Sequence, residues 1–329
     1  MELQRYDLIG DIHGQHDKLL ALLGTLGYSP RGDRSRGEFA GWTHPEGRKV
    51  IFLGDYIDRG PKIREVLHEV RGMVDSGDAL AIMGNHEYNA VLYQMPDGQG
   101  GWLRARWGKN RENHAATLAA FAGRESEWDD WIEWMKRLPM FLDLGGLRAV
   151  HASWDAPRIE WLRGQDLAGE DFLRASVDKS SPAYRAVEHV LKGPELDLPE
   201  GKFYVVHDHV RRNRIRARWW GVPDGPVPVG SLAMPAPIGI EDEVSAEKLR
   251  ELPNYGPGEP PVFFGHYWLP SEWPKAPLAP NLASLDYSAA FGDAPLVAYR
   301  WDGERILSNG KFRISPFGPI PPTAHESRD

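Results

Sequence analysis

The stretch VIFLGDYIDRGP, residues 50–61, shows how this chain is built. Four apolar residues are followed at once by a glycine, two acids and an arginine. A short apolar run that ends in glycine is typical of a buried strand whose chain turns tightly at its end. Proline at position 61 favours the first turn of a helix, and apolar residues continue at helical spacing through residues 62–74. The stretch therefore predicts a strand, a polar turn and a helix in succession.

Four other segments have the same design, an apolar run that ends abruptly in small and polar residues. These runs are residues 6–9 before Gly10-Asp11, 80–83 before Gly84-Asn85, 147–150 before His151, and 262–264 before Gly265-His266. A further helix is expected over residues 15–23. Strands and helices that alternate in this way indicate an α/β fold. Because ligands of such sheets bind beyond the carboxyl ends of the strands, we expect the five polar clusters to meet there.

The polar residues at these strand ends can bind metal ions. Asp11 and His13 are two residues apart, so in extended chain they point to the same side and could hold one ion. Asp55 has two oxygens that could bridge two ions. The remaining candidates, one amide and two imidazoles, are Asn85, His151 and His266. Such ligands suit Mn, Fe, Zn or Mg, and a pair of these ions is a recurring clamp for in-line displacement at phosphorus.

Each motif taken alone also has an ordinary structural interpretation. Asp-x-His is usually structural, residues 54–61 could be a solvated loop with a surface ion pair, and Asn85 could cap a helix. Single histidines at strand ends are more often satisfied structural residues than ligands. Five such strand ends in order are not expected by chance, however. Arg59 adds a guanidinium group, whose paired N–H donors suit a phosphate oxyanion. We therefore favour a metal site.

Composition excludes several other classes of protein. The chain has 329 residues, 41% of them apolar and 26% charged, which is typical of a soluble globular protein with one large domain or two ordinary ones. The absence of cysteine excludes disulfides, thiolate metal sites and a cysteine-phosphatase mechanism. The net charge of −8 disfavours non-specific binding of nucleic acid, with the basic run 211–218 as the one candidate patch. No apolar stretch is long enough to cross a membrane and no secretory signal is evident, so we expect a cytoplasmic protein.

We expect a single domain over residues 1–312 and a proline-rich tail over 313–329. Tryptophans punctuate a helical insertion at about 93–140, beside the mouth of the site. We interpret them as packing residues, with an aromatic wall for a base or peptide as the alternative. Residues 222–280 are rich in proline and glycine, which predicts irregular loop rather than a second core. Two closing strands are expected at 283–286 and 296–300.

The motifs together resemble a known family. Gly10-Asp11-Ile12-His13-Gly14, Gly54-Asp55-Tyr56-Ile57-Asp58-Arg59-Gly60, Gly84-Asn85-His86-Glu87, His151-Ala152 and Phe264-Gly265-His266 are similar to those of the calcineurin-like metallophosphoesterases. The match is to the phosphoprotein phosphatase branch, which also holds the symmetrical diadenosine tetraphosphate hydrolases. It covers residues 7–267, and 282–299 also resemble the closing strands of that branch. The resemblance implies a central β-sandwich flanked by helices, in α-β-β-α layers.

The resemblance also implies a role for each matched residue. Two divalent ions, most readily Mn, would lie in the site. Asp11 and His13 would hold the first, Asp55 would bridge, and the second would be held by Asn85, His151 and His266. A hydroxide bridging the ions would attack phosphorus in line. His86 would be the general acid, oriented by Asp58, and Arg59 would bind phosphate.

The sequence differs from the usual motifs of the family in two respects, and these bear on which branch it resembles. Trp268 stands where many phosphodiesterases of the wider superfamily have a further histidine ligand, which favours phosphatases and dinucleotide hydrolases. Phosphatases of this branch use a second arginine, and Lys192, Arg216 and Arg218 are all candidates here. The pair in His207-Asp208-His209 has ligand-like spacing, but we interpret this segment as a hairpin turn. The histidines without a partner in sequence are His16, His44, His68, His114, His189 and His325.

Three functions are compatible with these motifs. A serine/threonine protein phosphatase is our first expectation, with a phosphoprotein as the partner. A bis(5'-nucleosyl)-tetraphosphatase acting on diadenosine tetraphosphate is the alternative, which residues 263–268 favour. A catalytically inactive scaffold is disfavoured because every motif position is intact. The sequence predicts no membrane or nucleic-acid partner and leaves the oligomeric state open.

Overall fold

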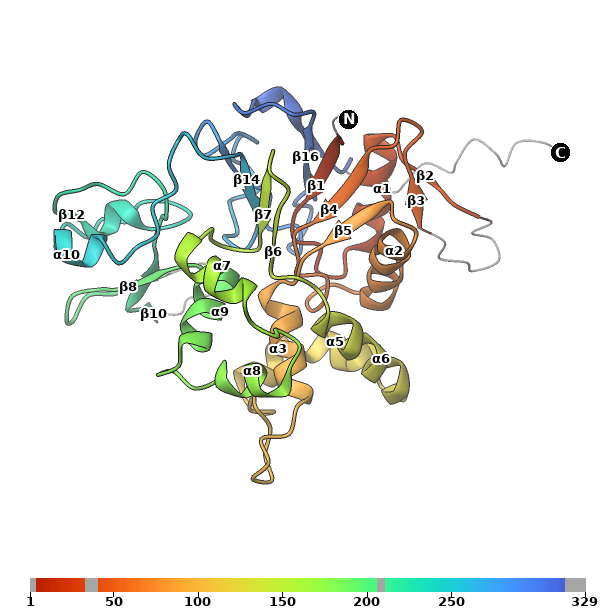
Figure 1. Cartoon of the computed structure of the whole chain (residues 1–329), viewed down its shortest axis with the longest axis horizontal. Coiled ribbons are helices and arrows are strands. Elements are labelled where there is room, and N and C mark those ends of the chain that lie inside the picture. The colour runs from red at the N-terminus through yellow and green to blue at the C-terminus, as the bar shows by residue number, and fades with distance from the viewer. Residues whose placement is uncertain (1–3, 33–40, 206–210, 317–329) are drawn as a thin grey trace.

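The computed structural model describes residues 4–32, 41–205 and 211–316 (Figure 1). One sheet has five strands in the order β17–β16–β1–β4–β5. Three of them are parallel: β1 (Tyr6–Ile9), β4 (Lys49–Phe52) and β5 (Ala79–Ala81). Strand β16 (Val297–Trp301) runs antiparallel to β1, and the edge strand β17 (Phe312–Ile314) runs antiparallel to β16. The strands predicted over 6–9, 50–53, 80–83 and 296–300 are confirmed to within two residues.

A second sheet has four strands in the order β15–β14–β7–β6. Its parallel strands are β7 (Arg148–Val150), β14 (Val262–Phe264) and β15 (Leu282–Ser284), and β6 (Phe141–Asp143) is antiparallel to β7. Phe263 of β14 packs on Tyr299 of β16, with ring centroids 5.0 Å apart. One cluster of buried apolar side chains includes both sheets. The two sheets therefore face each other, and the predicted central sandwich is confirmed.

Helices cover the sandwich, as Figure 1 shows. In the first sheet, a helix follows each parallel strand along the chain: α1 (His16–Leu26) comes after β1, α2 (Ile63–Asp75) after β4 and α3 (Asn85–Gln94) after β5. In the second sheet, β7 is followed by α7 (Ala156–Arg163), α8 (Glu170–Ala175) and α9 (Pro182–Lys192). Apolar residues of α2 recur at three- and four-residue spacing and are buried, among them Ile63, Val66 and Val70. The helices predicted over 15–23 and 62–74 are confirmed.

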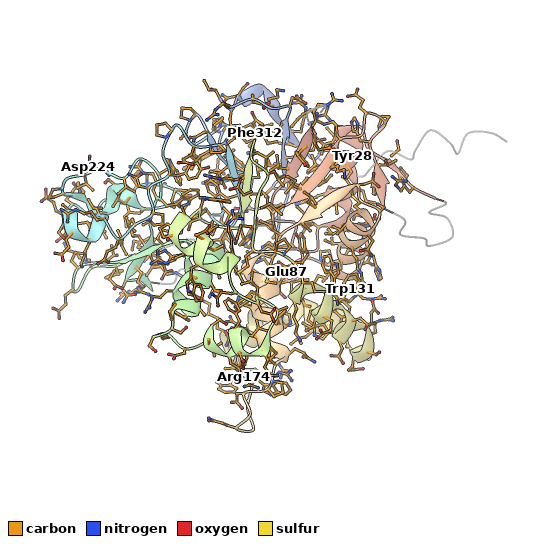
Figure 2. All side chains as sticks on the ribbon, in the orientation of Figure 1. Tyr28, Glu87, Trp131, Arg174, Asp224 and Phe312 are labelled. Carbon is orange, nitrogen blue, oxygen red and sulfur yellow. The ribbon has the colours of Figure 1, made fainter. Side chains whose placement is uncertain are left out.

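The expected insertion at 93–140 is helical in its second part. It contains α4 (Lys109–Asn113), α5 (Ala115–Ala120) and α6 (Glu125–Lys136), and α6 packs against α3. Trp128, Trp131 and Trp134 are buried, so packing is the correct interpretation for them. Figure 2 shows Trp131 within this helical layer. The interpretation is wrong for Trp107, whose exposed fraction is 72%.

The expectation that residues 222–280 form no core is wrong for their first half. A second core of buried apolar side chains lies apart from the main one (Figure 1, far left), and consists of Leu198, Ile215, Ala217, Val222, Val229, Leu232, Ala233, Val244, Leu249 and Leu252. It is built on β8 (Glu195–Asp197), β11 (Arg214–Arg216), β12 (Val227–Pro228), β13 (Glu243–Val244) and α10 (Ala246–Leu249). Single apolar residues between prolines have no periodicity, and their partners come from the β8–β11 hairpin outside the stretch. No local pattern could therefore reveal this core.

The short elements are β2 (Ser29–Pro30), β3 (Trp42–Thr43), β9 (Tyr204–Val205), β10 (Arg211–Arg212), and the 3₁₀ turns Val229–Leu232 and Asn309–Lys311. His207-Asp208-His209, His325 and residues 317–329 of the predicted tail lie outside the described residues. Within the described residues, no helix combines the length and apolar character that a membrane span requires.

Candidate active site

The six predicted ligands meet at the edge where the two sheets end. Asp55 follows β4 and its carbonyl oxygen accepts hydrogen bonds from the backbone N–H groups of Ile12 and His13, at 3.1 and 2.8 Å. On the other sheet, the N–H of Gly265 donates to the carbonyl oxygen of His151, at 2.9 Å. These bonds join the turns after β1 and β4, and those after β7 and β14. The carboxyl ends of parallel strands thus place side chains from distant parts of the sequence together.

Asp55 is at the centre of the cluster. Its Oδ2 lies 3.5 Å from Nε2 of His13, and its Oδ1 lies 3.4 Å from Nε2 of His151. The two oxygens of one carboxylate therefore face different imidazoles, as a bridging ligand requires. On the His151 side, Oδ1 of Asn85 lies 3.1 Å from Nε2 of His151 and 2.7 Å from Nδ1 of His266. Four potential ligand atoms thus surround one position.

Two groups of side chains are close enough to hold an ion. One consists of His13, Asp55 and His86, and the other of Asp55, His151 and His266, all of them buried. The first group includes His86 where the resemblance leads us to expect Asp11. The carboxylate of Asp11 instead accepts from the backbone N–H of His266, at 3.1 and 3.3 Å. Asp11 therefore lies beside the cluster, without completing its first group.

The unpaired polar atoms and charges of this cluster fit bound cations. Nδ1 of His13 lies 2.7 Å from the carbonyl oxygen of Ile57, which fixes the ring and directs Nε2 towards Asp55. That Nε2 is buried and has no hydrogen-bond partner among the described residues. Burial, with the nearby charges of His86 and Arg59, lowers the pKa of His13 to about 3, so the imidazole is in its neutral, metal-binding form.

The buried carboxylates of the cluster also fit bound cations. Burial, and then the neighbouring charge of Asp286, raises the pKa of Asp11 well above its usual range. Burial alone would also raise the pKa of Asp55, but the surrounding imidazoles, His151 foremost, lower it well below the usual range. Three buried carboxylates that repel one another are an environment that divalent cations relieve.

The turns that hold these residues have strained backbones. Positive φ angles occur at His13 (45°), Asp55 (53°), Asp58 (66°), Arg59 (66°) and His266 (70°). Left-handed backbone is unfavourable for residues other than glycine, and it persists where the surrounding structure enforces it, often at functional sites. Five of the predicted site residues share this property, which a sequence pattern alone does not reveal.

Two glycines leave room for the acids themselves. A Cβ atom at Gly265 would lie 1.9 Å from Oδ1 of Asp11, and one at Gly84 would lie 2.2 Å from Oδ1 of Asp55. Gly84 and Gly265 therefore do more than permit a tight turn. Each lets a carboxylate approach the backbone.

Glu87 fixes the turn after β4 to the start of α3. Its carboxylate accepts from the N–H groups of Asp55 and Tyr56, at 2.8 and 2.7 Å, and from that of Gly84, at 2.9 Å. Figure 2 shows Glu87 near the centre of the molecule. The sequence analysis quoted Glu87 within a motif but gave it no role.

Asp58 binds three side chains. It accepts from Nδ1 of His86 at 2.6 Å, as predicted, and also from Nδ1 of His114 at 2.8 Å and the hydroxyl of Thr117 at 2.5 Å. Burial opposes the charged form of His86, but Asp55 and Asp58 together raise its pKa. His114 had no partner in the sequence analysis because it lies in the insertion, 56 residues from Asp58. The insertion therefore reaches the predicted general acid through Asp58.

Only Arg216 of the three candidates for a second phosphate-binding residue adjoins the site among the described residues. Nη1 of Arg216 donates to the carbonyl oxygen of His266, at 3.1 Å, and burial and this charge lower the pKa of His266 well below its usual value. Lys192 instead forms an ion pair with Glu188. Arg218 is directed to the carbonyl oxygen of Gly221, at 3.5 Å. Arg216 belongs to β11, so the segment with the second core supplies a cation to the site.

Comparison with known proteins gives consistent results. The family model for calcineurin-like phosphoesterase matches residues 5–270. The asymmetrical bis(5'-nucleosyl)-tetraphosphatase PrpE of Halalkalibacterium halodurans is 42% identical over 91 residues, 28% of this chain and 34% of the relative. The symmetrical bis(5'-nucleosyl)-tetraphosphatase of Klebsiella pneumoniae is 28% identical over 141 residues, 37% of this chain and 44% of the relative. The chain thus matches between a third and a half of the length of these curated relatives.

The solved structures that align with this chain over most of its length have lower sequence identity to it than the relatives above. A protein serine/threonine phosphatase of Saccharomyces cerevisiae has 10% identity and a TM-score of 0.49, covering 97% of this chain and 81% of its own. A cold-active protein-tyrosine phosphatase of a Shewanella species has 15% identity and a TM-score of 0.40, covering 95% and 81%. Likeness at this level does not distinguish one substrate from another.

Proposed function

Since the chain belongs to the calcineurin-like phosphoesterases, we propose that it is a hydrolase of phosphoric esters or anhydrides that uses two divalent metal ions. The observation that carries this proposal is the position of Asp55, whose two oxygens face two separate groups of ligands. Asp55 would be a ligand of both ions. His13 would hold one ion, with Asp11 beside it, and Asn85, His151 and His266 would hold the other. Manganese is the metal we propose first, with iron, zinc or magnesium as alternatives.

Two ions bound there supply a nucleophile at neutral pH and neutralise charge at phosphorus. The chain itself positions the phosphate and provides the proton. Arg59 lies with Nη2 3.4 Å from Nε2 of His86, so a phosphate oxygen held by Arg59 places its leaving group beside His86. Arg216 approaches from β11, in the segment with the second core, and binds a second phosphate oxygen.

His86 protonates the leaving oxygen. Asp58 holds Nδ1 of this ring and favours its charged form, which leaves Nε2 directed towards the substrate. His114 and Thr117 in turn hold Asp58. They are positioning residues, because they act on the leaving group through Asp58 and His86.

Dinucleoside polyphosphates are the substrates that we propose first. The relatives named above are bis(5'-nucleosyl)-tetraphosphatases, and this reverses the order of substrates expected from the motifs. A phosphoprotein is the second candidate, since the turns at 10–14, 54–60 and 84–87 resemble those of protein phosphatases. Both substrates need the same metals, cations and acid.

One assay tests the reaction and ranks the substrates. The protein is stripped of metal, supplied with Mn²⁺, and given diadenosine tetraphosphate, a phosphoserine peptide and p-nitrophenyl phosphate in parallel. We expect metal-dependent hydrolysis, fastest on the dinucleotide, and its loss in Asp55→Asn. The exposed Asp224, which Figure 2 shows at the outer edge of the molecule, gives the matched control Asp224→Asn, which should stay active. Absence of turnover on all three substrates would refute the proposal, and faster turnover of the peptide would restore the protein phosphatase.

A further inference from the structure

An exposed aromatic pair, Trp268 and Phe291, stands beside the phosphate-binding arginine. Their ring centroids are 5.2 Å apart and the rings meet at 62°. Trp268 is 38% exposed and Phe291 is 50% exposed. The guanidinium carbon of Arg59 lies 3.9 Å from the centre of the Trp268 ring and 5.5 Å from that of Phe291. Two large apolar side chains are therefore held in solvent next to the position of the reacting phosphate.

The fold holds Trp268 in place at a conformational cost. Its φ angle is 52°, a left-handed conformation that is unfavourable for a bulky residue. The buried carboxylate of Asp286 accepts from the N–H of Trp268 at 2.8 Å and from that of Ser288 at 3.0 Å. The hydroxyl of Ser288 donates to the carbonyl oxygen of Leu269, at 3.1 Å. The loops after β14 and β15 thus fix one another, and the backbone that carries Trp268 is held in place before any ligand arrives.

Stacking on Trp268 leaves Arg59 able to bind phosphate. A guanidinium stacks through its face and donates hydrogen bonds in its plane, so both interactions can exist together. Only the guanidinium group then separates a phosphate bound by Arg59 from the aromatic pair. A cover for Arg59 alone would not require Phe291, which is the more distant and the more exposed of the two rings.

We propose that Trp268 and Phe291 form a stacking surface for a nucleobase of the substrate. This inference rests on the proposed function and specifies the substrate class as a nucleotide. A nucleotide has a ribose between its phosphate and its base, so a base can lie beyond Arg59, at the aromatic pair, while the phosphate is bound by Arg59. A phosphoserine side chain has no ring to stack. The aromatic wall expected among the tryptophans of the insertion thus has its counterpart in the loops after β14 and β15.

The test compares substrates with and without a base. Diadenosine tetraphosphate and inorganic tetrapolyphosphate both contain a linear chain of four phosphates, and the ratio of their kcat/KM values isolates the contribution of the nucleosides. Stacking of one base on an aromatic side chain corresponds to about a 5- to 150-fold effect on affinity. We expect this ratio to fall by about that factor in Phe291→Ala, mainly through KM, and also in Trp268→Ala. Phe203→Ala removes another half-exposed phenylalanine, whose ring packs under the guanidinium of Arg211, and should keep the parent ratio.

The outcomes separate this inference from the proposed function. A parent protein that hydrolyses neither substrate, nor a phosphopeptide, refutes both. A parent that is active on both, with an unchanged ratio in Phe291→Ala and Trp268→Ala, refutes the stacking surface alone. An equal loss on both substrates shows that the pair only supports Arg59 and also refutes it. Phenyl phosphate is the third probe. If the variants lose as much activity on phenyl phosphate as on the dinucleotide, the pair binds any aryl group, and a surface for a nucleobase is refuted.

Discussion

The turns at the strand ends contribute to the candidate site in one way. The insertion and the segment with the second core, here called the added segments, contribute in another. The turns at residues 10–13 and 54–59 carry ligands on strained backbone, and Gly84 and Gly265 leave room for the carboxylates of Asp55 and Asp11. The insertion contributes His114 and Thr117, which bind Asp58, and the segment with the second core contributes Arg216. The turns therefore determine whether the chemistry occurs at all. The added segments adjust its rate and its substrate, and their loss should cost less.

The largest effect is expected for the general acid in the turn after β5. His86→Asn should lower kcat by about 10²- to 10⁴-fold on a substrate whose leaving oxygen is basic, such as the serine oxygen of a phosphoserine peptide. The loss should be much smaller with p-nitrophenyl phosphate, because p-nitrophenolate leaves without a proton. Steady-state kinetics on the two substrates measure the difference. Equal losses on both would assign His86 to metal binding, the role that its place beside His13 and Asp55 also permits.

Arg216 is the test of whether the segment with the second core contributes to catalysis. Removing one charged donor at a developing negative charge costs about 10²- to 10³-fold in kcat. We expect a loss of this size for Arg216→Met on every substrate with a phosphate group. Arg218→Met is the matched control from the same segment and should change kcat little. Similar activity in the two variants would remove Arg216 from the site.

His114 tests the contribution of the insertion. His114→Gln should lower activity by about 10-fold, the lower end of the range for residues that orient a functional group through a hydrogen bond. The loss should be confined to substrates with a basic leaving oxygen, as for His86. His44→Gln changes another buried histidine, which packs on Tyr28, and serves as the control. A loss that is uniform across leaving groups would show that His114 only stabilises the fold.

The smallest effect on activity is expected from the second core itself. Ile215 is fully buried beside Arg216 on β11. Ile215→Ala should lower the free energy of unfolding by about 2–5 kcal/mol, by loss of buried apolar contacts. Chemical denaturation measures this change. Activity under native conditions should fall only a few-fold, less than in Arg216→Met, and a fall as large as in that variant would contradict the proposed division of roles.

The turns could be predicted from the sequence because each is a contiguous run of a few residues. An apolar strand, a glycine and a polar ligand stand next to one another, so local geometry and chemistry are visible together, and Asp11, Asp55 and His266 can be identified in this way. His114 and Asp58 are 56 residues apart, and only the folded insertion brings them together. Arg216 could not be separated from Lys192 and Arg218, because the choice depends on which side chain the β8–β11 hairpin directs towards His266.

The second core shows the same limit in packing. Its apolar residues are isolated between prolines and glycines, and burial depends on contacts between residues 196–217 and 222–252. Trp107 shows the reverse case, since a tryptophan that the sequence assigns to packing is exposed. Asp286 was quoted only as part of a closing strand, and its role in holding Trp268 depends on a loop that is distant in sequence.

The central claim is that Asp55 bridges two divalent ions, and the most direct test is a crystal structure of the protein with manganese, analysed by anomalous scattering. The account predicts two manganese peaks about 3.5–4 Å apart, each beside one oxygen of Asp55. One of them should lie near His13 and the other near Asn85, His151 and His266. A single peak, or two peaks that do not both contact Asp55, would contradict the account.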